Sequence, residues 1–134
     1  RDPTYDDGVG DDSTAPEYDI DIAVSSATEL GALQLEITHL GSSGSWVGRG
    51  ARVDCAPTVD ALLAANFFGG RGVKIALINL DGIPTPGSVV RCGFRTHERL
   101  TPASFQVRIV DAANSESQAV NPLPDVVVSS IVRR

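Results

Sequence analysis

The stretch Tyr18-Asp19-Ile20-Asp21-Ile22-Ala23-Val24 decides the fold of this chain. Its even-numbered positions are large and apolar, whereas its odd-numbered positions are acidic or small. A period of two sends alternate side chains to opposite faces of a β-strand, so that one face enters a core and the other meets water. The stretch therefore predicts a half-buried strand near the start of the chain.

The same alternation returns along the rest of the sequence. We expect strands over residues 18–25, 31–39, 51–56, 73–80, 88–95, 104–111, 117–121 and 125–132. Clusters of Gly, Pro, Ser and Asn separate these segments, as at 41–45, 69–72, 81–87 and 121–124. Many short strands punctuated in this way predict an all-β domain, a β-sandwich of the jelly-roll type with about eight or nine strands. Only residues 60–66 have helical character, and there we expect a single short turn.

Acidic residues are concentrated at the start of the chain. The net charge is −6 over 134 residues, which suit one domain with a core of its own. Residues 1–21 contain eight acidic residues and only Arg1 as a base: Asp2, Asp6, Asp7, Asp11, Asp12, Glu17, Asp19 and Asp21. We therefore predict an acidic extended tail or linker over 1–17, disordered by itself and lying along a partner, followed by a sandwich domain over 18–134.

The remaining sequence is close to neutral, with scattered Lys and Arg. This distribution argues against nucleic acid and against an anionic membrane surface, both of which call for clustered cations. No apolar run approaches the roughly 20 residues of a membrane span. The chain contains no Met and starts at Arg1, so we expect either that a signal peptide was removed or that the sequence was trimmed. We favour an exported protein, extracellular or periplasmic.

Cys55 and Cys92 are the only cysteines. Their spacing fits neither a zinc ribbon nor a Cys-x-x-Cys redox pair. Two interpretations remain, a disulfide in an exported protein and two buried free thiols. We favour the disulfide, since both residues lie in strand-like segments on apolar faces.

The order of several segments resembles that of cohesin domains, which are secreted bacterial β-sandwiches. The resemblance spans about 110 residues from Tyr18 onward. It rests on Gly31-Ala32-Leu33-Gln34-Leu35-Glu36-Ile37, on Leu62-Leu63-Ala64-Ala65-Asn66-Phe67, on Gly72-Val73-Lys74-Ile75-Ala76-Leu77, on Val89-Val90-Arg91-Cys92-Gly93-Phe94 and on Phe105 to Asp111. Residues 41–50 depart from the family, because a Gly/Ser loop carrying Trp46 replaces its usual Tyr-Asp-Pro turn.

The resemblance implies a protein that binds another protein through one sheet, made in cohesins of the eighth, third, sixth and fifth strands. It places the two cysteine-bearing segments on neighbouring strands, within bridging range. If the cysteines point inward, alternation turns the intervening polar residues outward on that same sheet. We therefore predict a partner-binding face formed by Arg52, Asp54, Lys74, Ile78, Arg91 and Arg95, with Trp46 as a further anchor in the core or at the interface.

No motif in the sequence indicates catalysis, a cofactor or a metal ion. His39 and His97 fall at predicted strand ends, where we expect surface imidazoles, and no Gly-x-Ser-x-Gly motif accompanies them. The Asp cluster at 6, 7, 11 and 12 lacks the ligand pattern of a calcium loop. Residues 69–72 are glycine-rich but precede a strand, whereas phosphate loops precede a helix.

We therefore predict a non-enzymatic binding or assembly subunit of a larger exported complex. A carbohydrate-binding accessory module of a secreted hydrolase is the alternative, with Trp46 as the sugar contact. A small hydrolase using His39 or His97 is the third hypothesis.

Overall fold

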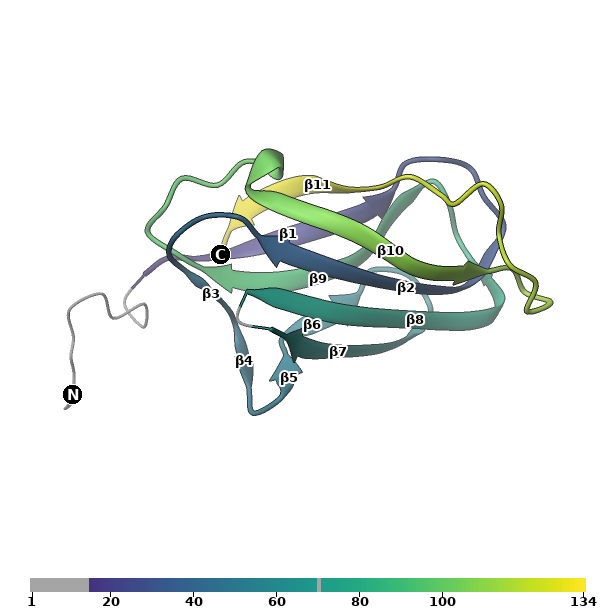
Figure 1. Ribbon diagram of the computed structural model, residues 1–134, viewed down its shortest axis with the longest axis horizontal. Coiled ribbons are helices and arrows are strands. Elements are labelled where there is room, and N and C mark those ends of the chain that lie inside the picture. Colours follow the sequence, from purple (N-terminus) through teal and green to yellow (C-terminus); the bar gives the residue numbers. More distant parts are fainter. Residues whose placement is uncertain (1–14, 70) are drawn as a thin grey trace.

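The computed structural model describes residues 15–69 and 71–134, which form two antiparallel β-sheets packed face to face (Figure 1). The all-β sandwich expected from the alternation is confirmed. Its strands are β1 (Glu17–Val24), β2 (Leu30–His39), β3 (Ser45–Trp46), β4 (Gly48–Arg49), β5 (Arg52–Val53), β6 (Cys55–Pro57), β7 (Leu62–Phe68), β8 (Gly72–Ile83), β9 (Gly87–Arg95), β10 (Phe105–Ala113) and β11 (Val126–Arg133). One 3-10 turn, Pro102–Ser104, precedes β10.

The strands are divided between two sheets that we call sheet A and sheet B. Sheet A has the order β11-β1-β9-β3, and β6 also pairs with β9. Sheet B has the order β10-β2-β8-β7-β5-β4. Because β8 and β9 follow each other along the chain but lie in different sheets, the link over residues 84–86 carries the chain across the sandwich.

Side chains from both sheets meet in one core. Ile20 and Ile22 of β1 and Leu35 and Ile75 of sheet B are fully buried, at 0% exposure. At one end of the core four rings pack together: His39, Trp46, Phe94 and Phe105. The Trp46 and Phe94 ring centroids are 5.0 Å apart and the rings meet edge to face, a favourable arrangement of aromatic pairs.

The disulfide favoured from the sequence is present, and it lies where the chain changes sheet. The predicted strand over 51–56 is two short strands, β5 in sheet B and β6 in sheet A, separated by Asp54. Cys55 and Cys92 are directly opposite each other on β6 and β9, with Cα atoms 4.0 Å apart. The covalent bond fixes β6 to sheet A immediately after the crossing.

The helical expectation for residues 60–66 is wrong, because Leu62–Phe68 form strand β7. Leu63 and Ala65 point inward, opposite Leu77 and Ile75 of β8, while Leu62 and Ala64 point outward. Leu and Ala favour helices in isolation, but pairing with the edge of β8 outweighs so small a local preference.

The strand predicted over 117–121 is also wrong. The chain makes only an isolated bridge there, between Ala113 and Ala119. Asn114 causes the change, because its side-chain oxygen accepts hydrogen bonds from the backbone N–H groups of Glu116 and Gln118, and Ser117 adopts a positive φ of 65°. These local hydrogen bonds stabilise a turn, so that no strand forms at these residues.

Most of the predicted acidic tail, residues 1–14, lies outside the described residues, and the strand β1 begins at Glu17. The two ends of the described domain are neighbours. The backbone N–H of Arg134 donates to the carbonyl of Glu17 at 2.9 Å. Both ends therefore belong to sheet A and lie at the same end of the sandwich (Figure 1).

Candidate functional site

The outer face of sheet B is organised in rows that run across its strands. Residues paired in register point to the same face, so the strand pairing defines each row. The first row is Ala113, Ala32, Ile78 and Leu62, and the second is Asp111, Gln34, Ala76 and Ala64. The third row is Arg108, Glu36, Lys74 and Asn66, continued by Arg52 and Arg49 on β5 and β4.

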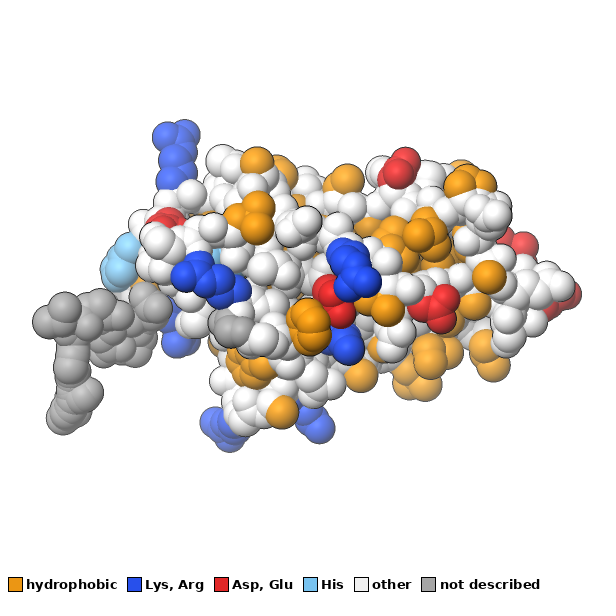
Figure 2. All heavy atoms as spheres, in the orientation of Figure 1, with side chains coloured by type: hydrophobic (Ala, Val, Ile, Leu, Met, Phe, Trp, Pro, Cys, Tyr) orange, Lys and Arg blue, Asp and Glu red, His pale blue; other side chains and the backbone are white. Residues whose placement is uncertain are grey.

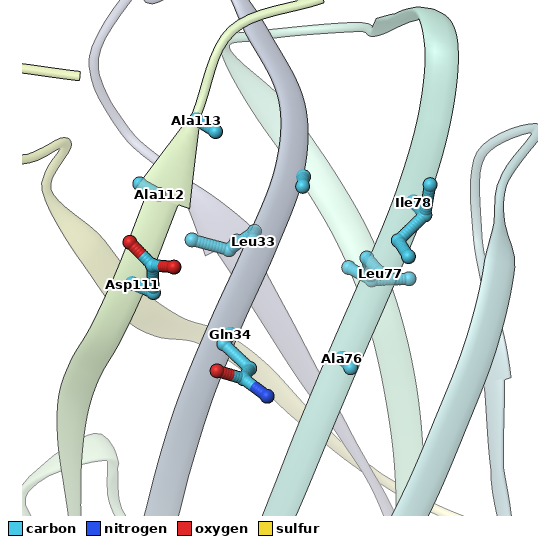
Figure 3. A pocket seen from close by; sticks show the side chains of 9 residues that line it. Leu33, Gln34, Ala76, Leu77, Ile78, Asp111, Ala112 and Ala113 are labelled. Atoms are coloured by element: carbon cyan, nitrogen blue, oxygen red, sulfur yellow. The ribbon is translucent and has the colours of Figure 1, made fainter. Parts of the chain in front are cut away.

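Small side chains hollow the first two rows. Ala32, Ala76 and Ala113 leave a depression of about 220 Å³, flanked by Gln34, Ile78 and Asp111 (Figure 3). Figure 3 shows Ile78 on one side of this depression and Asp111 on the other, on β8 and β10. We call it the alanine hollow. It is large enough to receive one apolar side chain of a bound molecule.

Exposed apolar side chains continue from the hollow to the β7 edge. Leu62 is 77% exposed, Leu80 64% and Ile78 46%. The three residues line a second depression of about 370 Å³, together with Asp60, Ala61 and Asn79. Figure 2, which views the molecule from the sheet B side, shows hydrophobic side chains gathered on the right half of this face. A contiguous exposed apolar patch of this kind is typical of an interaction surface.

The third row is rich in cations. The Arg108 guanidinium donates to the Glu36 carboxylate at 2.8 Å, and the Lys74 ammonium lies 5.1 Å from the centre of the Phe68 ring. Arg49, Arg52 and Lys74 make no ion pair with any residue of 15–69 or 71–134. We call Arg49, Arg52, Lys74 and Arg108 the basic row.

The outer face of sheet A differs, because its guanidinium groups are paired within the chain. Arg91 donates to Asp21 at 2.6 Å, and Arg95 pairs with Glu17. Hydrogen bonds from Arg95, and then from Arg134, hold the pKa of Glu17 below its ordinary value. The hydrogen bond with Asp21 raises the pKa of Arg91. These cations are therefore already paired within the chain.

Arg134 joins three segments of this face. Its guanidinium contacts Asp19 at 2.8 Å, Glu17 at 3.0 Å and Asp54 at 3.2 Å. The pKa of Arg134 is raised, above all by the hydrogen bond with Asp19. The guanidinium lies over Gly93, where a Cβ atom would come within 2.6 Å of one of its nitrogens. Gly93 thus provides the space that the ion pairs require.

The prediction that the six residues of the partner-binding face lie on one sheet is wrong. Arg52, Lys74 and Ile78 lie on the outer face of sheet B, whereas Arg91 and Arg95 belong to sheet A. Asp54 lies at the crossing between the sheets and pairs with Arg134. Alternation determines whether a side chain points inward or outward, but it does not say which sheet a strand joins. Whether any of these residues binds a partner stays a prediction.

Trp46 is not a surface contact. It is 5% exposed, and its indole N–H donates to the backbone carbonyl of Arg71 at 3.0 Å. The core interpretation of Trp46 is therefore confirmed, and both its role at an interface and its role as a sugar contact are contradicted by its burial. The sequence did not reveal this burial, because Trp46 lies in a Gly/Ser-rich stretch that has the composition of an exposed loop.

His39 is another residue that the sequence misplaced. It is 3% exposed rather than on the surface, because its ring packs between Phe94 and Phe105. Burial lowers the pKa of His39, although Glu98, 3.6 Å from its Nε2, partly opposes that effect. His97 is exposed, as expected. The position of His39 on the inward face of β2, in phase with Ile37, was the available signal.

Two further features of the described residues bear on the type of site. Within residues 15–69 and 71–134, no three His, Cys, Asp or Glu side chains come together as ligands for a metal ion. Over the same residues, no helix has the length and hydropathy needed to cross a bilayer.

The fold defines the class of protein as a jelly-roll β-sandwich. No family model matches the chain, and no curated protein matches it either. Its structure is similar to that of a non-cellulosomal cohesin from the hyperthermophilic archaeon Archaeoglobus fulgidus, with a TM-score of 0.59 and 15% sequence identity over 80% of this chain and 74% of that one. The domain therefore has a cohesin-like fold, as the sequence resemblance predicted.

Proposed function

We propose that this chain is a non-catalytic docking module that binds a protein partner through the outer face of sheet B. The observation that carries the proposal is the contrast between the two outer faces. Sheet A has guanidinium groups paired with carboxylates of the same chain, whereas sheet B has an alanine hollow, exposed Leu62, Ile78 and Leu80, and cations without a paired carboxylate among the described residues. An apolar centre with Arg beside it has the composition of a protein interface.

The position of the module in a larger assembly is part of the proposal. The Cys55–Cys92 disulfide supports an exported protein, because such bonds persist in oxidising compartments. We propose that the acidic segment at residues 1–14 lies along a partner in the same exported complex, in line with its composition. Arg52, Lys74 and Ile78 are the sequence-predicted residues that we retain as partner contacts.

A pair of matched variants tests the proposed face. Ile78 in β8 is 46% exposed and Val127 in β11 is 43% exposed, so Ile78→Asp and Val127→Asp place the same charge on similarly exposed positions of the two sheets. The native complex would be purified from the source organism, and its partner identified and titrated against each variant by calorimetry. We expect Ile78→Asp to weaken binding about a hundredfold and Val127→Asp to leave it unchanged.

Two results would contradict the proposal. If the native protein is purified as a monomer without any bound protein, the proposed docking function is contradicted. If the Ile78→Asp variant binds the partner with the same affinity as the unchanged protein, the outer face of sheet B is excluded as the binding site. Thermal unfolding of both variants checks that each remains folded.

A further inference from the structure

The basic row extends across the whole of sheet B. Its pairing runs from Arg49 to Arg52, then through Asn66, Lys74 and Glu36 to Arg108. Strands lie about 4.8 Å apart, so a row that crosses six of them is about 24 Å long. In Figure 2 the Lys and Arg side chains extend from the middle of this face toward the β4–β5 hairpin.

The positive charge of this row is left unbalanced by the described residues. Glu36, which lies between Lys74 and Arg108, is the one acidic residue along the row; it is only 9% exposed and is bound to Arg108. Arg49 and Arg52 are directly opposite each other, and like charges at such positions destabilise a strand pair. On sheet A, by contrast, Arg91 and Arg95 each have a carboxylate on the neighbouring strand. A bound anion would relieve the repulsion between Arg49 and Arg52.

The spacing of the cations favours an extended ligand over a small ion. Arg52, Lys74 and Arg108 lie on β5, β8 and β10, which are separated by two strand intervals in each case, or about 10 Å. Cations spaced in this way along a line offer successive contacts to an extended ligand. A polyproline II segment advances about 3.1 Å per residue and has three residues per turn, so acidic residues three positions apart lie on one side of it and match the interval.

Other polyanions fit this row less well. A nucleic acid presents a uniform line of phosphates and no apolar side chains, so it would leave the alanine hollow unfilled. The single Trp of the chain is buried and cannot stack on a sugar ring. The hollow and the exposed Leu62 beside the row suit a ligand that also carries apolar side chains, as a protein does.

We propose that the basic row binds an extended acidic segment of the protein partner, beside the apolar contacts of the alanine hollow. This inference rests on the docking function proposed above and specifies the chemistry of the partner. Arg52 and Lys74 contact carboxylates of that segment, while Ile78 and Leu62 contact its apolar neighbours.

A designed peptide tests the row directly. The probe is a 15-residue peptide of five Gly-Ser-Asp repeats, and its control has Asn in place of each Asp. Binding to the full chain is measured by fluorescence anisotropy at low and at physiological salt. We expect the Asp peptide to bind, with an affinity that falls as salt rises, and the Asn peptide not to bind.

Two double variants with the same net charge distinguish binding by the basic row from attraction by the overall charge of the chain. Arg52→Glu combined with Lys74→Glu should weaken peptide binding by about tenfold or more. Arg99→Glu combined with Arg133→Glu changes the net charge equally but lies off the row, at a loop and at the end of β11, and should leave binding within about twofold. Thermal unfolding of both double variants confirms that they are folded.

The outcomes distinguish this inference from the docking function itself. Absence of peptide binding at low salt, an equal loss in both double variants, or binding of heparin in place of the peptide would overturn the acidic-segment inference. A partner complex that tolerates Ile78→Asp would overturn the docking face, whatever the peptide result. A partner complex that Ile78→Asp disrupts but Arg52→Glu/Lys74→Glu leaves intact would overturn the role of the basic row alone.

Discussion

The two outer faces of the sandwich are both charged, yet they use their charges differently. On sheet A, Arg91, Arg95 and Arg134 bind carboxylates of the same chain. On sheet B, Arg49, Arg52 and Lys74 have no such partner among the described residues, and they lie beside a hollow and exposed Leu and Ile side chains. Exposed Arg residues are therefore not interchangeable: Arg91, Arg95 and Arg134 are paired within the chain, whereas Arg49 and Arg52 have no ion pair with the described residues.

The largest effect on the sheet A side is expected from loss of the disulfide. Replacing Cys55 and Cys92 together by Ser should lower the free energy of unfolding by about 3 to 4 kcal/mol, because a loop of this length is no longer closed in the unfolded chain. Denaturation in guanidinium measures the loss. The same variant, under conditions where it is folded, should still bind the acidic peptide. A change below about 1 kcal/mol would show that the bond contributes little to the fold.

A smaller effect is expected from the contact between Gly93 and Arg134. Gly93→Ala should displace the guanidinium and lower the free energy of unfolding by about 1 kcal/mol, and Arg134→Ala should do the same. Because both changes remove one set of ion pairs, their effects should not add in the double variant. Additive losses in a double-mutant cycle would contradict the shared contact.

Acid is expected to weaken the aromatic end of the core through His39. Its folded pKa lies below its ordinary value of 6.5, so its neutral form stabilises the fold fully above that value. This contribution is lost as pH falls from about 6.5 through the folded pKa. His39→Phe should therefore lose less stability than the unchanged protein between pH 7.5 and 5.5 in matched thermal unfolding curves. Parallel curves for the two proteins would exclude His39 as the cause.

The smallest effect on stability is expected on sheet B. Lys74→Ala and Ile78→Ala should each change the free energy of unfolding by less than about 0.5 kcal/mol, since both side chains are exposed and neither holds a described ion pair. Chemical denaturation checks this directly. A loss above 1 kcal/mol from either change would mean that sheet B, like sheet A, uses its surface to hold the fold.

The alternation of apolar residues predicted most of the fold. It located the long strands because each of them buries one face, as Ile20 and Ile22 do in β1. It missed β7, where Leu and Ala residues carry a helical preference that pairing with β8 overrides. It also predicted a strand near Ser117, where hydrogen bonds to the Asn114 side chain form a turn.

The candidate site was less predictable, for a physical reason. Lys74 and Arg91 have the same local pattern, an exposed cation between buried neighbours, and only long-range pairing assigns one to sheet B and the other to sheet A. The pairing of Arg91 with Asp21 and the hollow among Ala32, Ala76 and Ala113 arise from the register of distant strands. No local window of sequence contains that information.

The proximity of Glu17 and Arg134 has a consequence for any longer polypeptide that contains this domain. Segments attached before and after it would leave from adjacent points on sheet A. Mechanical tension along that polypeptide would act mainly on the paired residues where β1 begins and β11 ends. The rest of the sandwich would carry little of the load.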